Sequence, residues 1–407
     1  MHLVPVNEDT VRVGQPLPFA LMDKDGVLLA RKSFIIASRD ALADFARRGG
    51  GLYIDASDSE THLRAYVEQL HVAVRKDKPL GEIANTKLSA DSLGGRRNQD
   101  ERADWLDLQV QANSILRDAR SVNFMERLER LCAQLSRHSQ SNPDGTLFAL
   151  IHLSATEVHK YSATHAMLVS VMCGLAAREV LSWSEPRQLQ LCKAALTMNL
   201  SMTDLQDRLA LQAEALTTGQ RAAIDAHAAK SVEMLTALGV TDEVWLEAVH
   251  DHHTQKPGAL SEKSPAQQLA RLIQRADMFA ARLAPRASRQ PLSPAAAMQA
   301  CYFDEVRAID EAGAALIKAV GIYQPGSYVR LTTDEVAVVV KRGLNTTTPR
   351  VAVVVNRNGL PTVEPLVRDT SVREYRVVAS VAHRDMKVKI NLERMLALTA
   401  APSDRTW

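Results

Sequence analysis

The stretch GIYQPGSYVRL, residues 321–331, marks the point where the chain changes from helix-forming to strand-forming sequence. Its centre, Tyr323-Gln324-Pro325-Gly326, has the composition of a turn, and Tyr328–Leu331 begins a run of strand-forming residues. Two further β-branched runs follow, Glu335–Lys341 and Arg350–Val355. Since Asn358-Gly359 is typical of a hairpin turn, we predict a small β-rich C-terminal subdomain over residues 321–400.

Upstream of this stretch, residues 101–320 carry apolar side chains at helical spacing, and Thr217 with Gln220 forms a capping-box signal. We therefore expect a mainly α-helical protein whose largest domain is a helical bundle over 101–320. A polar, glycine-containing segment over 75–100 is typical of a linker. Residues 1–74 are predicted to form a small α/β domain, with a hairpin, a helix and a strand in the order Leu17–Met22 with Val27–Ala30, Ser38–Arg48 and Leu52–Asp55.

Composition limits the class of protein. With 46% hydrophobic and 4% aromatic residues over 407 positions, the chain is typical of a soluble, largely helical protein. Its formal net charge of +2 gives no electrostatic reason to expect nucleic-acid binding. No signal peptide and no apolar stretch long enough for a membrane span is seen, so we expect a cytoplasmic protein. The cysteines are too scattered for a zinc knuckle or a disulfide framework: Cys132, Cys173, Cys192 and Cys301.

Five polar residues stand out because helical spacing places each of them on an apolar face: His165, His227, His252, His253 and Asp277. A single inward histidine is usually a core residue with one satisfied hydrogen bond. A carboxylate on a buried face costs several kcal/mol without a partner, so Asp277 requires a metal, a histidine or an arginine. Taken together, the five residues favour a shared polar centre over independent core positions.

The order of motifs resembles that of the HD-GYP phosphohydrolases. It runs from NPD at 142–144 through YSATH at 161–165 and LT at 216–217 to His227, the pair His252-His253 and Asp277. The stretch at 321–331 looks like the C-terminal signature of that family, and the resemblance covers about residues 110–400.

Members of this family hydrolyse cyclic di-GMP, a bacterial second messenger, with two or three bound metals that are often iron or manganese. The resemblance therefore implies an HD-type helical bundle. It also implies a set of metal-ligand positions at His165, His227, His252, His253 and Asp277.

The chain departs from the family pattern where further ligands are expected. The His-Asp pair that names the family falls at Met198-Asn199, and the lysine that usually follows falls at Met202. After the paired histidines the chain reads TQKPG (254–258), so the family's glutamate and its Gly-Tyr-Pro loop are both missing. The acidic ligand expected one turn before the first histidine is replaced by Tyr161.

These departures bear on catalysis because two cations about 3.5–4 Å apart repel, and anionic ligands must offset that repulsion. Asn199 carries no charge, and Met198 offers a soft thioether that is badly matched to iron(II), manganese or magnesium. We therefore expect no stable two-metal site. One divalent ion, iron or manganese, held by some of the histidines and Asp277 is one alternative. The other is a metal-free network in which Asp277 is hydrogen-bonded to a histidine.

Three functions remain open. In the first, which we prefer, the chain is a degenerate HD-GYP protein of cyclic di-GMP signalling that acts without catalysis, as a monomer or homodimer. It would bind cyclic di-GMP or a protein such as a GGDEF-type cyclase. The second is a residual metal-dependent cyclic di-GMP phosphodiesterase, and the third is a helical domain with structural histidines. Lys256, Lys230 and Arg271 could attract phosphates, although solvated lysines are the commoner explanation of such residues.

Overall fold

The computed structural model describes residues 3–8, 11, 13–14, 17, 19–31, 34–55, 88–89, 103–287 and 292–400. The chain divides into two compact units, Met1–Ser114 and Ile115–Trp407. The expected linker over 75–100 lies outside the described residues except for Leu88–Ser89. The domain limits that the sequence predicts, 1–74, 75–100, 101–320 and 321–400, therefore stay predictions.

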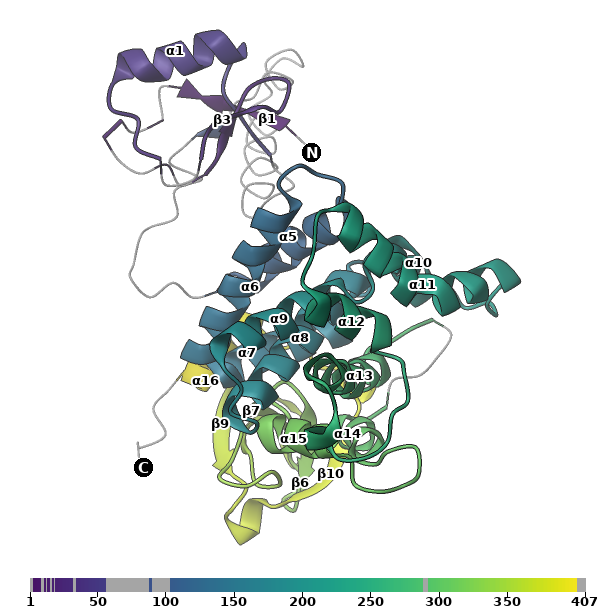
Figure 1. Ribbon diagram of the computed structural model, residues 1–407. Helices are drawn as coiled ribbons and strands as arrows, with labels where there is room; N and C mark the ends of the chain where they lie inside the picture. Colours follow the sequence, from purple (N-terminus) through teal and green to yellow (C-terminus); the bar gives the residue numbers. More distant parts are fainter. Residues whose placement is uncertain are drawn as a thin grey trace. The chain divides into compact units, whose positions relative to one another are not determined.

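Within the described residues of the N-terminal part, up to Ser89, the chain forms one small sheet and one helix (Figure 1). The sheet has the strand order β3-β2-β4-β1-β5. Its strands are β1 (Leu3–Asn7), β2 (Leu21–Met22), β3 (Leu28–Ala30), β4 (Tyr53–Asp55) and β5 (Leu88–Ser89). Helix α1 (Arg39–Gly49) is capped by Ser38 and ends at Gly50, whose φ of 63° is left-handed. The predicted hairpin, helix and strand are thus present in the order that the sequence indicated.

Between residues 105 and 320 the chain is helical, as its periodicity predicts. Both the Thr217–Gln220 capping box and a second one, Ser264–Gln267, begin helices of this region. The helices are α5 (Trp105–Arg117), α6 (Phe124–Ser141), α7 (Pro143–Thr156), α8 (Tyr161–Glu179), α9 (Glu185–Thr197), α10 (Thr203–Leu211), α11 (Thr218–Ala237), α12 (Glu243–Asp251), α13 (Pro265–Leu283), α14 (Pro294–Tyr302) and α15 (Glu311–Val320).

Helix α8 lies at the centre of the helical region. It is buried along nearly its whole length, and a helix that is apolar on all sides belongs inside a bundle rather than at its surface. Its neighbours are α7, α9, α13 and α15, and Figure 1 shows α8 and α13 close together. Because His165 lies on α8, its side chain is buried in the interior of the helical region.

The C-terminal part is an antiparallel sheet with the strand order β10-β6-β7-β8-β9. The three expected strands are present as β6 (Tyr328–Leu331), β7 (Val336–Lys341) and β8 (Arg350–Val355). Gly359 has a φ of 78° in the predicted hairpin turn. The sequence did not indicate three further elements: β9 (Pro361–Asp369), β10 (Val377–Val381) and α16 (Leu392–Ala400).

The stretch at 321–331 forms a tight corner between α15 and β6. The fully buried Gln324 donates from Nε2 to the Gly321 carbonyl at 2.7 Å, and Ser327 Oγ donates to the Gln324 carbonyl at 2.7 Å. Gly326 has a φ of 91°, and a Cβ there would lie 2.9 Å from the Phe148 carbonyl oxygen. Only glycine allows this close approach of the corner to α7.

Arg342 fixes the sheet to the helices. Its guanidinium donates to Asp144 at 2.7 Å, at the start of α7, and to Glu179 at 2.8 Å, at the end of α8. The fold class expected from the sequence is confirmed: the protein is mainly α-helical, with a small N-terminal α/β part and a small β-rich C-terminal part. Among the described helices, none is both long and apolar enough to cross a membrane.

Candidate functional site

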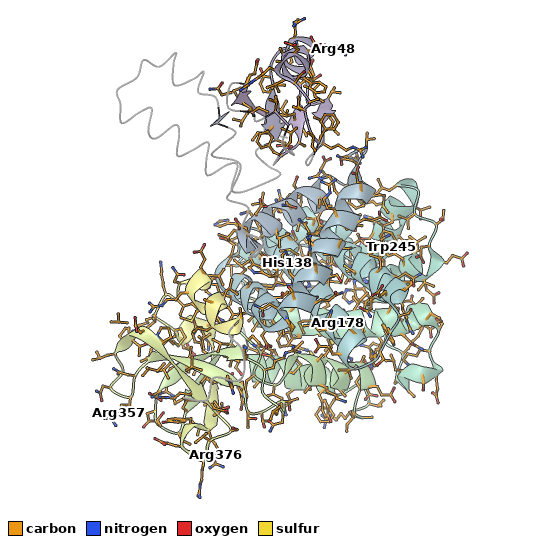
Figure 2. The ribbon with its side chains drawn as sticks, turned by 90° about the vertical axis from the view of Figure 1, so that its left-hand side faces the viewer. Arg48, His138, Arg178, Trp245, Arg357 and Arg376 are labelled. Carbon is orange, nitrogen blue, oxygen red and sulfur yellow. The ribbon has the colours of Figure 1, made fainter. Side chains whose placement is uncertain are left out.

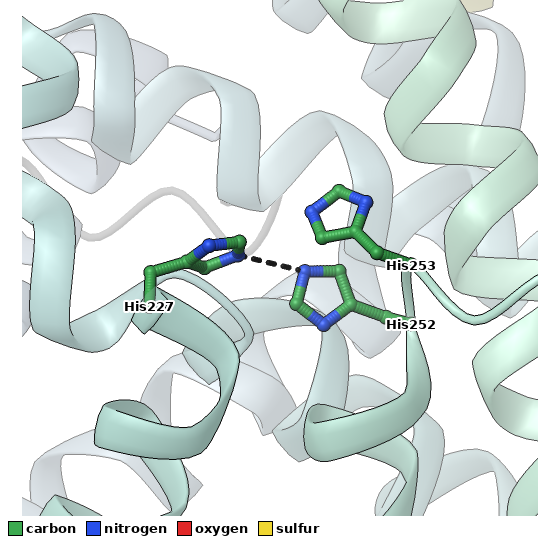
Figure 3. A group of neighbouring side chains, drawn as sticks. All are labelled: His227, His252 and His253. Carbon is green, nitrogen blue, oxygen red and sulfur yellow. Dashed lines mark hydrogen bonds between the residues drawn. The ribbon is translucent and has the colours of Figure 1, made fainter. Parts of the chain in front are cut away.

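Helix α11 and the C-terminal end of α12 bring three of the expected histidines together (Figure 3). His227 lies in the middle of α11, and His252 and His253 follow directly after α12. One ring nitrogen from each of the three lies within 4.8 Å of the others. His252 and His227 are buried, whereas His253 is exposed. The cluster therefore has two fixed members inside the protein and one member at the surface.

Backbone carbonyls orient the two buried rings. His227 Nδ1 lies 2.5 Å from the Ile224 carbonyl oxygen, and His252 Nδ1 lies 2.6 Å from the Val249 carbonyl oxygen. Since a carbonyl can only accept, each Nδ1 carries the proton and donates it. The unprotonated nitrogen of each ring is then Nε2, and the two Nε2 atoms are 3.2 Å apart, joined by the dashed line in Figure 3.

Burial keeps both of these rings neutral at neutral pH. It lowers the pKa of His252 to about 3, assisted by the charge of His253, and it also lowers the pKa of His227. Two neutral rings with protonated Nδ1 atoms point lone pairs at each other across 3.2 Å. That contact is favourable only with a proton or a cation between the two nitrogens.

The donor set fits a divalent metal ion. Metal-binding histidines commonly donate their second ring N–H to a backbone carbonyl, as both buried rings do here. Two imidazole nitrogens at about 2.1 Å from one tetrahedral ion are about 3.4 Å apart, close to the observed spacing. The residues that would hold an ion are thus His227 and His252, with His253 within reach.

His165 and Asp277 form a separate pair next to this cluster. His165 Nε2 on α8 lies 2.7 Å from Asp277 Oδ1 on α13, and the two side chains are 2% and 16% exposed. Burial alone would raise the pKa of Asp277, but the His165 hydrogen bond and the neighbouring histidines hold that pKa well below its usual range. On sequence grounds Asp277 requires a metal, a histidine or an arginine as its partner, and in the structure this partner is His165.

Two further side chains, Tyr161 and Arg286, stack next to His165. The ring of Tyr161 stacks on that of His165, with centroids 5.5 Å apart and planes 19° from parallel. Arg286 donates to the Tyr161 hydroxyl at 2.5 Å. The position where the family would have an acidic ligand is therefore filled by an aromatic ring and a guanidinium. Sequence reasoning missed Arg286, which lies 125 residues from Tyr161.

The residues on either side of Met198 and Asn199 are hydrogen-bonded to α12 and α11, the helices that position His227, His252 and His253. Directly before them, Thr197 Oγ1 accepts from Trp245 Nε1 of α12 at 3.0 Å. Shortly after them, Ser201 Oγ donates to the His227 carbonyl at 2.8 Å. Met198 is fully buried, and the buried Asn199 Oδ1 has no hydrogen-bond partner within the described part of the chain. The segment is held in place, but it presents a thioether and a neutral amide.

The three cationic residues expected to attract phosphates do not form one patch. Arg271 is buried, and its guanidinium donates to Glu305 at 2.9 Å and to Asp310 at 2.7 Å. Lys256 pairs with Asp251 at 3.0 Å. Lys256 and Arg271 line a common recess of about 10 Å³, which has room for about one water molecule. Lys230 is exposed on α11.

The ion pairs of Arg271 therefore disfavour its expected role, and the phosphate contacts stay a prediction. Sequence reasoning missed the acids that occupy this arginine, because Glu305 and Asp310 lie more than 30 residues further along the chain. Arg275 donates to the same Glu305 at 3.0 Å, so the four side chains tie α13 to the segment before α15.

No sequence-family description matches the chain, and no curated protein matches it in sequence. Among solved structures, the chain is similar to Bd1817, a HDG"Y"P protein from Bdellovibrio bacteriovorus. The two are 14% identical, and the match covers 77% of this chain and 98% of that chain with a TM-score of 0.43.

Proposed function

We propose that the chain is a degenerate HD-GYP-type protein of bacterial cyclic di-GMP signalling that holds one divalent ion and does not hydrolyse the nucleotide. The observation that carries this proposal is the facing pair of Nε2 atoms of His227 and His252, 3.2 Å apart, with each Nδ1 directed at a backbone carbonyl. When bound, a divalent ion at this point would act as a Lewis acid toward an anionic ligand.

Three features support a single ion over a two-metal centre. The spacing of the two buried nitrogens suits neighbouring ligands on one ion. The Asp277 carboxylate is engaged by His165. Met198 and Asn199 supply no charge to bridge two cations. A donor set of imidazoles also favours iron or zinc over manganese, which prefers oxygen ligands.

Met198 and Asn199 offer no carboxylate to bridge two cations, and this bears directly on hydrolysis. A two-metal phosphodiesterase holds its attacking water between the cations and neutralises the charge that develops on phosphorus. Within the described residues, the site instead combines the neutral rings of His227 and His252 with an Asp277 carboxylate that already pairs with His165. We infer that the protein acts by binding, either of cyclic di-GMP or of a signalling protein such as a GGDEF-type cyclase.

A turnover assay tests this proposal. The chain, supplied with excess iron(II) or manganese(II) under anaerobic conditions, is incubated with cyclic di-GMP, and the products are separated by chromatography. We expect no linear dinucleotide above a protein-free control. The His227→Ala variant serves as the matched control, since it removes one proposed ligand. Hydrolysis by the unaltered chain that disappears in His227→Ala would show a residual phosphodiesterase and overturn the proposal.

A further inference from the structure

The C-terminal sheet carries a cleft with no part in the histidine site. Its floor is a single row of residues paired across all five strands, as the strand registers show. The row consists of Ala379, Arg330, Val336, Val355 and Pro361, in the order β10-β6-β7-β8-β9. The cleft has a volume of about 740 Å³, and the segment 385–389 forms its other wall.

The floor lies on the same sheet face as an apolar cluster that the helices cover. In that cluster, Tyr328, Val338 and Ala352 pack with Phe148 of α7 and Met395 of α16. The row that contains Arg330 is the next one along the strands. This part of the face therefore combines apolar neighbours with one guanidinium, that of Arg330, which is exposed on β6, the second strand of the sheet.

The wall segment alternates between two kinds of side chain. Met386 and Val388 are half-buried, whereas Lys387 and Lys389 are exposed. This alternation is what an extended segment shows when one side faces a sheet and the other faces solvent. The cleft thus has an apolar interior between the sheet and the segment, with lysines along its outer edge.

The charge around the cleft is positive and largely uncompensated. The one acid in its lining, Asp385, lies 3.4 Å from Arg384. Within the described part of the chain, Lys387 and Lys389 make no ion pair, and Arg330 reaches only the Asp334 carbonyl at 3.4 Å. Solvated surface lysines are common, whereas the Arg330 guanidinium stands beside Ala379 and Val336 in a row whose other members are all apolar.

We propose that this cleft binds a small carboxylate with an apolar body, of the fatty-acyl class. Its volume falls within the range of small-molecule sites, about 300–1,000 Å³, which are mostly apolar with a few placed polar groups. The apolar row and Val388 receive the body of the ligand. The guanidinium of Arg330 receives the carboxylate in the two-pronged geometry that suits this pair. This inference does not rest on the proposed function of the histidine site.

Calorimetric titration of the full chain with octanoate tests the proposal. We expect saturable binding of one octanoate per chain, with no comparable binding of acetate or 1-octanol. Acetate has the charge without the apolar body, and octanol has the body without the charge. The Arg330→Gln variant should weaken octanoate binding about tenfold, because it removes a charged hydrogen-bond partner. The Ala379→Trp variant should abolish binding by filling the floor.

The matched control is Arg376→Gln. Arg376 is exposed, does not line the cleft, and extends from the C-terminal sheet in Figure 2. Its replacement should leave octanoate affinity unchanged, and circular dichroism should show that all three variants are folded. The proposal is overturned if octanoate does not bind, if octanol or acetate binds as tightly, or if Arg330→Gln and Ala379→Trp both bind octanoate like the unaltered chain.

Discussion

Replacing Asp277 with alanine is expected to lower the free energy of unfolding by about 3 kcal/mol. His165 Nε2 has Asp277 as its partner at 2.7 Å, and the buried His165 Nδ1 has no partner within the described part of the chain. The substitution would therefore leave a buried imidazole with neither nitrogen satisfied. Urea unfolding in metal-free buffer measures the effect, because a bound ion would add its own contribution.

Two further variants distinguish the loss of the His165–Asp277 hydrogen bond from a general effect of removing a negative charge. Asp225→Ala changes an exposed carboxylate on α11 and should alter stability by less than about 0.5 kcal/mol. The double variant His165→Leu with Asp277→Leu should recover most of the loss, because apolar side chains can replace a buried polar pair at little cost. A loss below about 1 kcal/mol in Asp277→Ala would mean that the pair does not hold α8 to α13.

The second large effect is expected from introducing the His-Asp pair of the HD-GYP pattern at this position, with Met198→His and Asn199→Asp together. In metal-free buffer the double variant should be about 2–3 kcal/mol less stable than the unaltered chain, because it places an imidazole and a charge at buried positions. With iron(II) at about 100 times its dissociation constant, metal binding should raise the free energy of unfolding by about 2.7 kcal/mol. The melting temperature should then rise by roughly 5–10 °C.

The matched control for this experiment is the same double variant carrying His227→Ala. If Met198 and Asn199 occupy ligand positions between α11 and α12, removal of His227 should cancel most of the metal-dependent rise. A metal-dependent rise in melting temperature no larger than that of the unaltered chain would show that the segment between Thr197 and Ser201 does not face the histidine cluster.

The fold could be predicted where local chemistry decides it. The capping box at Thr217 begins a helix, and the turn around Gly326 separates helix from sheet. Strand β9 escaped prediction because it is mostly exposed and contains two prolines, so its sequence lacks the apolar alternation of β7 and β8. A mostly exposed strand leaves little hydrophobic pattern in its sequence.

The site could be predicted only in part. Helical spacing showed that the histidines and Asp277 lie on apolar faces, and His165, His227 and His252 are indeed buried. It could not show that they form two groups, since this depends on how four helices pack. The carbonyls that orient His227 and His252 belong to the backbone, and any residue type would supply them.

Metal analysis shows whether the histidine cluster holds one divalent ion. The full chain is purified without chelators, loaded with iron(II) or zinc(II) and freed of excess metal. Its metal content is then measured by inductively coupled plasma mass spectrometry. We expect one equivalent per chain, and none in the His227→Ala variant. Two equivalents per chain, or one equivalent that His227→Ala retains, would show that the cluster is not a site for one ion.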